Sequence, residues 1–269
     1  TTGSRNTAVG QNALVLNTTA SNNTAVGQDA LFSNTTGTQN TAVGSEALDA
    51  CTTGSYSTAV GAYALTSATT GEQNTCIGRS AGIGVTTGNY NCAMGINAFS
   101  SATSASDSVG IGRQALGNVT TADDNTAVGS LALDACTTGN ANTAVGKGAA
   151  TAVTTGGQNV IVGENAGVVL TTGNTNTCVG RDSGGQLTTG SNNLLLGHDA
   201  GKSGSPFHLT TASNKIILGD NNIDGCHIKV DWTVSSDQRD KTDIQDITTG
   251  LDFVNQLKPK SFWFKKDRD

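Results

Sequence analysis

Few side chains in this 269-residue chain have the chemistry to bind a metal ion or form a disulfide. Its cysteines and histidines are Cys51, Cys76, Cys92, Cys136, Cys178, Cys226, His198, His208 and His227. A metal site needs Cys and His clustered at ligand spacing, and these residues form no such cluster along the sequence. Free cysteine behaves as a small hydrophobic residue and is usually buried. We therefore predict buried structural cysteines, no bound metal and no cofactor.

Acidic and nucleophilic side chains are also sparse. Glu46, Glu72 and Glu164 are far apart and form no pair suited to acid–base cleavage of a glycan. The densest polar stretch is 234–244, which reads VSSDQRDKTDI and by composition alone indicates a polar loop. Any chemistry there depends on the elements that surround it.

Most of these elements are predicted from a repeated sequence motif, Asn-Thr-Ala-Val-Gly, which first occurs at residues 6–10. Its glycine, here called the marker glycine, recurs every 17 residues without slippage in twelve coils: Gly10, Gly27, Gly44, Gly61, Gly78, Gly95, Gly112, Gly129, Gly146, Gly163, Gly180 and Gly197. Such a strict interval indicates that each repeat is one coil of a stacked solenoid, because an extra residue would disturb both neighbouring coils. We number the coils 1 to 12 and count positions from each marker glycine.

Composition and charge agree with a solenoid and argue against some partners. The chain has 35 glycines, two prolines and 4% aromatic residues, which suits stacked coils with small interior side chains. The net charge of −6 provides no basic footprint for nucleic acid. No apolar run reaches the roughly 20 residues that span a bilayer, so we predict no membrane insertion.

Three positions of the repeat have a clear predicted role. Position −1 is apolar in every coil, which predicts that it faces the core. If it does, the small Ala at −2 is free to approach another chain closely. Position +3 is Ala in eleven of twelve coils and indicates a tight corner. Position −4 is Asn in ten of twelve coils, which predicts amide hydrogen bonds passed from coil to coil.

A second recurring element, Thr-Thr-Gly, occupies positions +8 to +10, as at residues 52–54. Threonine favours strand and glycine permits a tight turn, so each coil is predicted to contain a strand, a corner, a second short strand and a turn. Twelve coils at about 4.8 Å make a rod roughly 55 Å long. Cys51 and Cys136 share a position five coils apart, roughly 24 Å, beyond the reach of a disulfide.

The unit Asn-Thr-Ala-Val-Gly-x-x-Ala-Leu resembles the head repeats of trimeric autotransporter adhesins and repeat regions of phage tail fibres. The similarity covers roughly residues 1–200. It implies an all-β fold, a left-handed parallel β-roll of 17-residue coils, and association with itself as a homotrimer.

The period breaks after Gly197, because the next matching glycine is Gly219, 22 residues later. Pro206 and Phe207 lie in this gap, where we predict a loop or cap on the last coil. Nine of the fifteen Lys and Arg residues follow residue 213, which indicates a different domain. The predicted domains are a solenoid at 1–200, a cap and neck at 201–235, and a separate domain at 236–269.

Residues 234–244 resemble the Ser-Asp-x-Arg-x-Lys entry of the self-cleaving intramolecular chaperone of endosialidases and many phage tail spikes and fibres. A predicted helix capped by Thr249, with Leu251, Val254 and Leu257 on one face and Pro259 at its end, and a predicted strand at 261–264, follow in the family's order.

The family's chaperone trimerises a fibre and then cuts itself off, and we expect residues 236–269 to be its N-terminal part. The resemblance implies that Ser236 is the nucleophile, Lys241 its base, and Ser235–Ser236 the cleaved bond. This serine–lysine chemistry requires a neutral Lys241, hence a buried lysine with a lowered pKa.

The leading hypothesis is a structural or adhesive segment of a trimeric fibre. It is a phage or virus tail fibre that attaches to a host surface receptor or glycan, and its place is the virion or an extracellular cell surface. The alternatives are a trimeric surface adhesin of a bacterium, a self-processing protease, and an ice-binding solenoid. Ice binding needs alternating threonines on a flat face, whereas adjacent threonines such as Thr52 and Thr53 point to opposite faces.

Five aromatic residues interrupt the repeat and are either contact residues or packing variants: Phe32, Tyr56, Tyr63, Tyr90 and Phe99.

Overall fold

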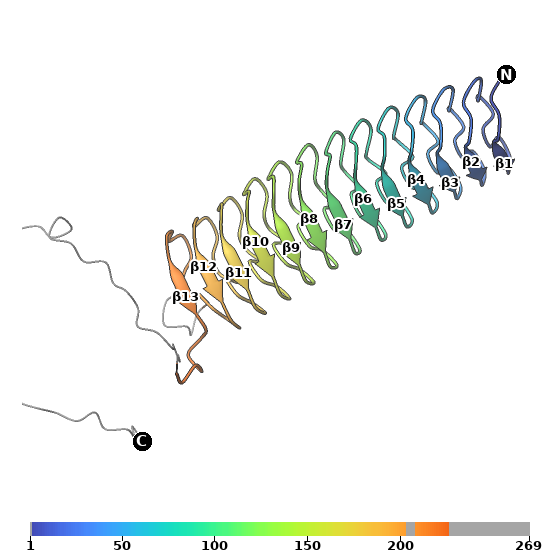
Figure 1. Ribbon diagram of the computed structural model, residues 1–269. Helices are drawn as coiled ribbons and strands as arrows, with labels where there is room; N and C mark the ends of the chain where they lie inside the picture. Colours follow the sequence, from blue (N-terminus) through green and yellow to red (C-terminus); the bar gives the residue numbers. More distant parts are fainter. Residues whose placement is uncertain (1, 203–207, 226–269) are drawn as a thin grey trace, which may run out of the picture. The chain divides into compact units, whose positions relative to one another are not determined.

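The protein is a parallel β-solenoid with one short strand in each coil. The computed structural model describes residues 2–202 and 208–225, and a compact unit ends at Asp224. Within this part all regular structure is strand, and one sheet runs from β1 to β13 in sequence order (Figure 1). The strands are β1 Thr7–Val9, β2 Thr24–Val26, β3 Thr41–Val43, β4 Thr58–Val60, β5 Thr75–Ile77, β6 Cys92–Met94, β7 Val109–Ile111, β8 Thr126–Val128, β9 Thr143–Val145, β10 Val160–Val162, β11 Thr177–Val179, β12 Leu194–Leu196 and β13 Ile216–Leu218.

The 17-residue interval sets the pairing register. Each strand in coils 1 to 11 pairs in parallel with the strand one repeat later, as in Thr41↔Thr58. The marker glycines of coils 1 to 12 have φ between 112° and 140°, a region that L side chains avoid. A Cβ atom at Gly112 would lie 2.5 Å from the carbonyl oxygen of Gly129 in the next coil. The marker must therefore be glycine, because the coils stack through it.

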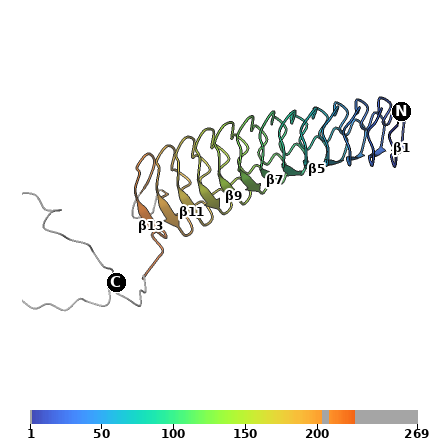
Figure 2. The ribbon, with the colours of Figure 1, turned by 45° about the horizontal axis from the view of Figure 1, so that its top comes forward.

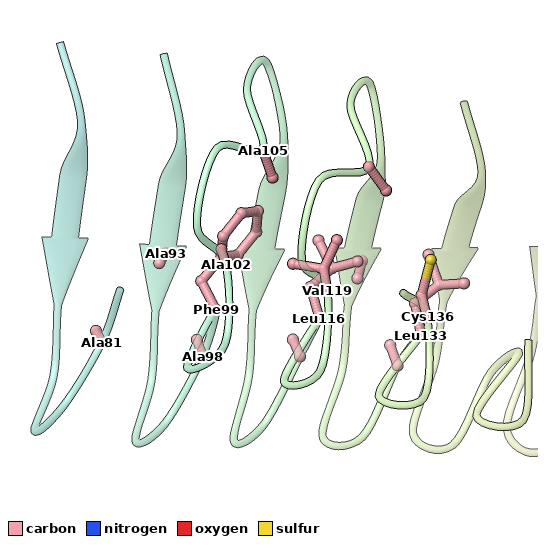
Figure 3. Close-up of a cluster of buried hydrophobic side chains, with 14 of the residues drawn as sticks. Ala81, Ala93, Ala98, Phe99, Ala102, Ala105, Leu116, Val119, Leu133 and Cys136 are labelled. Atoms are coloured by element: carbon pink, nitrogen blue, oxygen red, sulfur yellow. The ribbon is translucent and has the colours of Figure 1, made fainter. Parts of the chain in front are cut away.

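The interior of each coil is formed by positions −2, +3, +4, +7 and +10. Ala127 at −2, Ala132 at +3 and Leu133 at +4 have no exposed surface in coil 8. Figure 3 shows Leu133 and Cys136 beside Leu116 and Val119 of the preceding coil, in the space between the strands and the returning chain. The corner predicted at +3 is confirmed, since small residues fill it.

The prediction that position −1 faces the core is wrong. The side chain of Ile111 is 36% exposed and that of Met94 is 38% exposed, whereas Ala at −2 is buried. Successive strand residues point to opposite faces, and the sheet turns its alanine inward. Ala is therefore not available to approach another chain, and the larger apolar side chains at −1 lie on the outer face.

Core volume is balanced between positions −2 and +4. Where a coil carries a larger residue at −2, its position +4 is glycine: Cys76 with Gly82, Ile161 with Gly167, Cys178 with Gly184, and Leu195 with Gly201. A Cβ atom at Gly167 would lie 2.7 Å from Cδ1 of Ile161. Because the backbone repeat is fixed, the interior admits one large side chain at these two positions.

The predicted asparagine ladder at position −4 is confirmed. The backbone N–H of Asn142 donates to Oδ1 of Asn125 in the preceding coil, at 2.9 Å. Its side-chain Nδ2 donates to the carbonyl of Gly156 in its own coil, at 2.9 Å. Where serine replaces asparagine, its hydroxyl oxygen accepts the hydrogen bond from the next coil. Oγ of Ser108 accepts from the backbone N–H of Asn125 at 3.0 Å. Each buried amide thus joins two coils and closes its own turn.

The predicted second strand is wrong for the described residues, because Thr-Thr-Gly forms a bend. The N–H groups of Thr137 and Thr138 both donate to the carbonyl of Thr154, at 2.9 and 3.3 Å. Oγ1 of Thr137 donates to the same oxygen at 3.2 Å. Three donors that converge on one carbonyl are incompatible with a regular strand ladder.

The sheet continues past the predicted end of the repeats at residue 200. β12 pairs with β13 through Leu194↔Ile216, so register is kept although 22 residues separate the two positions. The helix and aromatic strand predicted within 249–264 lie outside the described residues.

Candidate functional surface

The most prominent surface of the described chain is the outward face of the sheet, formed by positions −3 and −1 of every strand. Both views show the strands following one another along one side of the coil stack (Figure 2). Position −3 is mostly threonine, and position −1 is Val, Ile, Met or Leu. None of the thirteen strands carries a charged residue at either position. With twelve steps of about 4.8 Å, this face is about 58 Å long.

A groove follows the flank of this face at its C-terminal end. It has a volume of about 400 Å³ and is lined by residues at −5 and −3, including Thr175, Thr177, Asn192 and Leu194. Position −5 therefore lies directly beside the outward face, on the side where each strand begins. On the other side the strand ends at the marker glycine, and position +1 follows.

Four cysteines confirm the prediction of buried thiols. Burial raises the pKa of Cys76 and Cys178 to about 12, and that of Cys51 and Cys136 to about 11. A nucleophilic thiol needs a lowered pKa and access to solvent, so these four are structural. Cys92 differs, because it occupies position −3 of β6 and is half-buried on the outward face. Cys226 lies outside the described residues.

The stacking brings together charged groups that are distant in sequence. Ligand atoms of Asp182, His198 and Asp199 lie within 4.8 Å of one another. Nδ1 of His198 is also 3.4 Å from a carboxylate oxygen of Asp220. The expectation that the histidines form no cluster was made along the sequence, and it missed His198 because Asp182 and Asp220 come from outside its own coil.

Cations accompany this cluster. Nζ of Lys202 lies 3.1 Å from Asp199 and 3.8 Å from Asp182, and Arg181 contacts His198. A hydrogen bond from the backbone N–H of Asn222, with a smaller contribution from His198, lowers the pKa of Asp220. The arrangement is an ion-pair network that links coils 11 and 12 to the residue after Gly219.

The aromatic substitutions divide between the two readings. Phe99 is fully buried in the interior, so it is a packing variant. Tyr56 and Tyr90 are 55% and 56% exposed at position −5 of coils 4 and 6, with φ near 60°. Tyr63 is 39% exposed at +2. Phe32 is partly buried at +5.

The predicted catalytic residues Ser236 and Lys241, and the predicted cleaved bond Ser235–Ser236, lie outside the described residues. In the part of the chain that the structure describes, no helix is long and apolar enough to cross a membrane.

Comparison with known proteins bears on the C-terminal segment. Residues 236–269 match the family model described as chaperone of endosialidase. Neither a curated protein nor a solved structure matches the chain. The match begins at Ser236, where the polar stretch first suggested this family. The chain thus carries a β-solenoid followed by a segment similar to an endosialidase chaperone, and this combination fits a structural protein of the tail-fibre kind.

Proposed function

We propose that this chain is a segment of a homotrimeric fibre, of the tail-fibre type that phages and viruses use to attach to a host. The observation that carries the proposal is the uncharged outward face, on which the apolar side chain at position −1 of every strand is exposed or partly exposed. The solenoid is the rigid shaft or head, and it holds a surface for a host receptor or glycan away from the base of the fibre.

The dimensions of the face support a partner of matching length. Two columns of side chains about 10 Å wide and about 58 Å long amount to roughly 600 Å² per chain. Within this area the column at position −1 is an apolar stripe beside the mostly threonine column at −3, and extended apolar surfaces on a soluble protein are usually interaction sites. A partner must keep the same rise per coil to stay in contact along the whole length, and a parallel copy of this chain does so. The chaperone match supports three copies, because the resemblance implies a trimerising domain.

The same geometry also serves a bacterial surface adhesin, which shares the fibre architecture. One observation favours a different function, ice binding. The strands alternate threonine at −3 with a branched residue at −1 on one face, as in Thr126 and Val128, and this regular array replaces the Thr-Thr-Gly pairs that argued against it. Ice binding requires the face to be free, so an assembly that covers the face excludes it. Thermal hysteresis of a monomeric protein would support ice binding instead.

The first test is the mass of the protein in solution. We expect light scattering to give a trimer. Replacing Ile111 by Asp at position −1 places a carboxylate in each proposed interface, so we expect it to destabilise the trimer by at least about 2 kcal/mol per chain. The control is Thr138→Asp at position +9, an exposed site away from the face, which should leave the trimer intact. A stable wild-type monomer would refute the proposal.

The second test concerns maturation. The proposal assigns Ser236 as the nucleophile of self-cleavage and Lys241 as its base. We expect denaturing mass spectrometry to show the wild-type protein cut before Ser236 and the Ser236→Ala variant uncut. The Ser235→Ala variant keeps the nucleophile and should still be cut. Cleavage that persists in Ser236→Ala would remove this assignment while leaving the fibre proposal standing.

A further inference from the structure

Four of the five cations within residues 1–200 lie on one edge of the outward face. Residues 1–200 contain five Lys or Arg, and four of them occupy position +1 at intervals of 34 residues: Arg79, Arg113, Lys147 and Arg181. The fifth, Arg5, is at −5 of coil 1. From coil 5 to coil 9, no acidic residue occupies +1 or +2. All four +1 cations are exposed, so this edge is positive although the protein is acidic overall.

The opposite edge carries acids. Glu72 lies at position −6 of coil 5, and Asp107 lies at position −5 of coil 7. Asp123 and Asp124 occupy the same two positions in coil 8. Position −5 borders the outward face, as the groove beside Thr175 and Thr177 shows. From coil 5 to coil 8, then, the face lies between a positive edge and a negative edge.

Charges on the two edges are not paired within the described chain. Asp107 and Arg113 lie beyond opposite ends of the three-residue strand β7. No ion pair between described residues includes Arg79, Arg113, Glu72 or Asp107. Arg113 does act on the partly buried Asp134, where it partly offsets the rise in pKa that burial causes.

The other two cations behave differently. Lys147 is 3.6 Å from Glu164 and Arg181 is 3.3 Å from Asp182, so both have an acidic partner in their own chain. Their coils, 9 and 11, have no acid at −5 or −6. Among the four cations at position +1, the two without an ion pair between described residues are thus the two whose coil carries an acid on the opposite edge.

We propose that the two edges recognise each other between copies of this chain. In a cyclic assembly of parallel copies, each interface joins one edge of a subunit to the other edge of the next. Arg79 of one copy then faces Glu72 of its neighbour, and Arg113 faces Asp107, coil against coil. The inference rests on the proposed homotrimer and specifies what aligns it.

Pairing between the two edges would fix the alignment of the copies along the fibre, which the outward face alone leaves ambiguous. Positions −3 and −1 are nearly identical from coil to coil, so the face alone fits equally well after a slip of one coil. A slip in one direction places Arg113 opposite Asp124 but Arg79 opposite Tyr90, and a slip in the other direction leaves both cations without an acid. Only the aligned assembly satisfies both, which is how charge complementarity fixes register.

The test is a charge-reversal cycle on the complete protein, with trimer dissociation followed by analytical ultracentrifugation at low salt. Arg113→Asp and Asp107→Arg each place like charges at three interfaces, and we expect each to raise the dissociation constant at least about tenfold. The double variant restores opposite charges and should recover most of the loss. The mismatched control combines Asp107→Arg with Lys147→Asp, which lie two coils apart and should not rescue each other.

Three outcomes are distinguishable. Rescue by the matched pair alone, diminishing at high salt, supports the alignment. A wild-type trimer in which the two single effects simply add overturns the inference and leaves the proposed fibre intact. A wild-type protein that is monomeric refutes the proposed function itself, and the cycle then has no interface to report on.

Discussion

At the scale of single residues, the interior of the solenoid is a volume constraint that side chains satisfy in combination. Phe99 replaces the more usual leucine at position +4, and Gly110 replaces the usual alanine at −2 in the next coil. A Cβ atom at Gly110 would lie 2.9 Å from Cδ2 of Phe99. Gly110 is not among the residues with positive φ, so its backbone conformation admits alanine, and the phenylalanine ring is the closest obstacle, followed by the carbonyl oxygen of Ala115 at 3.2 Å.

This contact predicts a reciprocal pair of substitutions. We expect Gly110→Ala alone to destabilise the protein by about 1–3 kcal/mol, because it overpacks a closed interior. Phe99→Leu alone should cost a similar amount, because it leaves a cavity. Together they recreate the Ala and Leu combination of neighbouring coils, and the double variant should be close to the wild type. Thermal unfolding of the four proteins gives the coupling energy, and simple additivity would contradict the prediction.

At the scale of the coil, the sequence predicted what a strict repeat determines. The 17-residue interval and the Asn at −4 were sufficient for the parallel stack and its amide ladder, because each coil meets only copies of itself. The burial of Cys51 and Cys136 followed from the usual behaviour of free cysteine as a small hydrophobic residue. Each of these features depends on which residue occupies a single repeat position, and the sequence states that directly.

The direction of the strand could not be predicted in the same way. Positions −2 and −1 are both apolar, so a period of two does not show which one enters the coil. Ala enters because a one-strand coil has little room, and Val is left outside, where an apolar residue signals a partner and not a core. The second strand failed for a related reason. Threonine favours strand. In the structure, however, the backbone N–H groups of two successive threonines donate to one carbonyl oxygen, as at Thr154, and this bend replaces the strand.

The candidate surface was even less accessible from sequence. Arg79 and Arg113 are 34 residues apart, and their common edge exists only once the coils are stacked. The cluster of His198, Asp182 and Asp220 has the same origin, since each member comes from a different coil or from beyond the last one. Such sites can be found in the sequence by comparing the residues that occupy the same repeat position in successive coils.

At the scale of the whole molecule, the solenoid is one-dimensional, and each coil touches only its two neighbours. The number of coils can therefore change without a change of fold, which is not possible for a protein with a single globular core. The strands pair residue for residue, as in Ala8↔Ala25 and Ala42↔Ala59. If complete coils are removed, every remaining residue should still pair with the residue at the same repeat position in the next coil. If part of a coil is removed, the asparagines at −4 and the marker glycines should be displaced from their partners.

The corresponding prediction uses a deletion of residues 11–44, which removes two complete coils and joins Gly10 to Ser45. We expect a folded rod shorter by about 10 Å, still trimeric, because Arg79, Glu72, Arg113 and Asp107 move together and stay aligned. The maximum dimension from small-angle scattering and the mass from light scattering measure both properties. Deleting residues 11–36 instead removes one and a half coils and should lower the melting temperature sharply. Equal melting temperatures for the two deletions would show that stacking register does not hold the fold together.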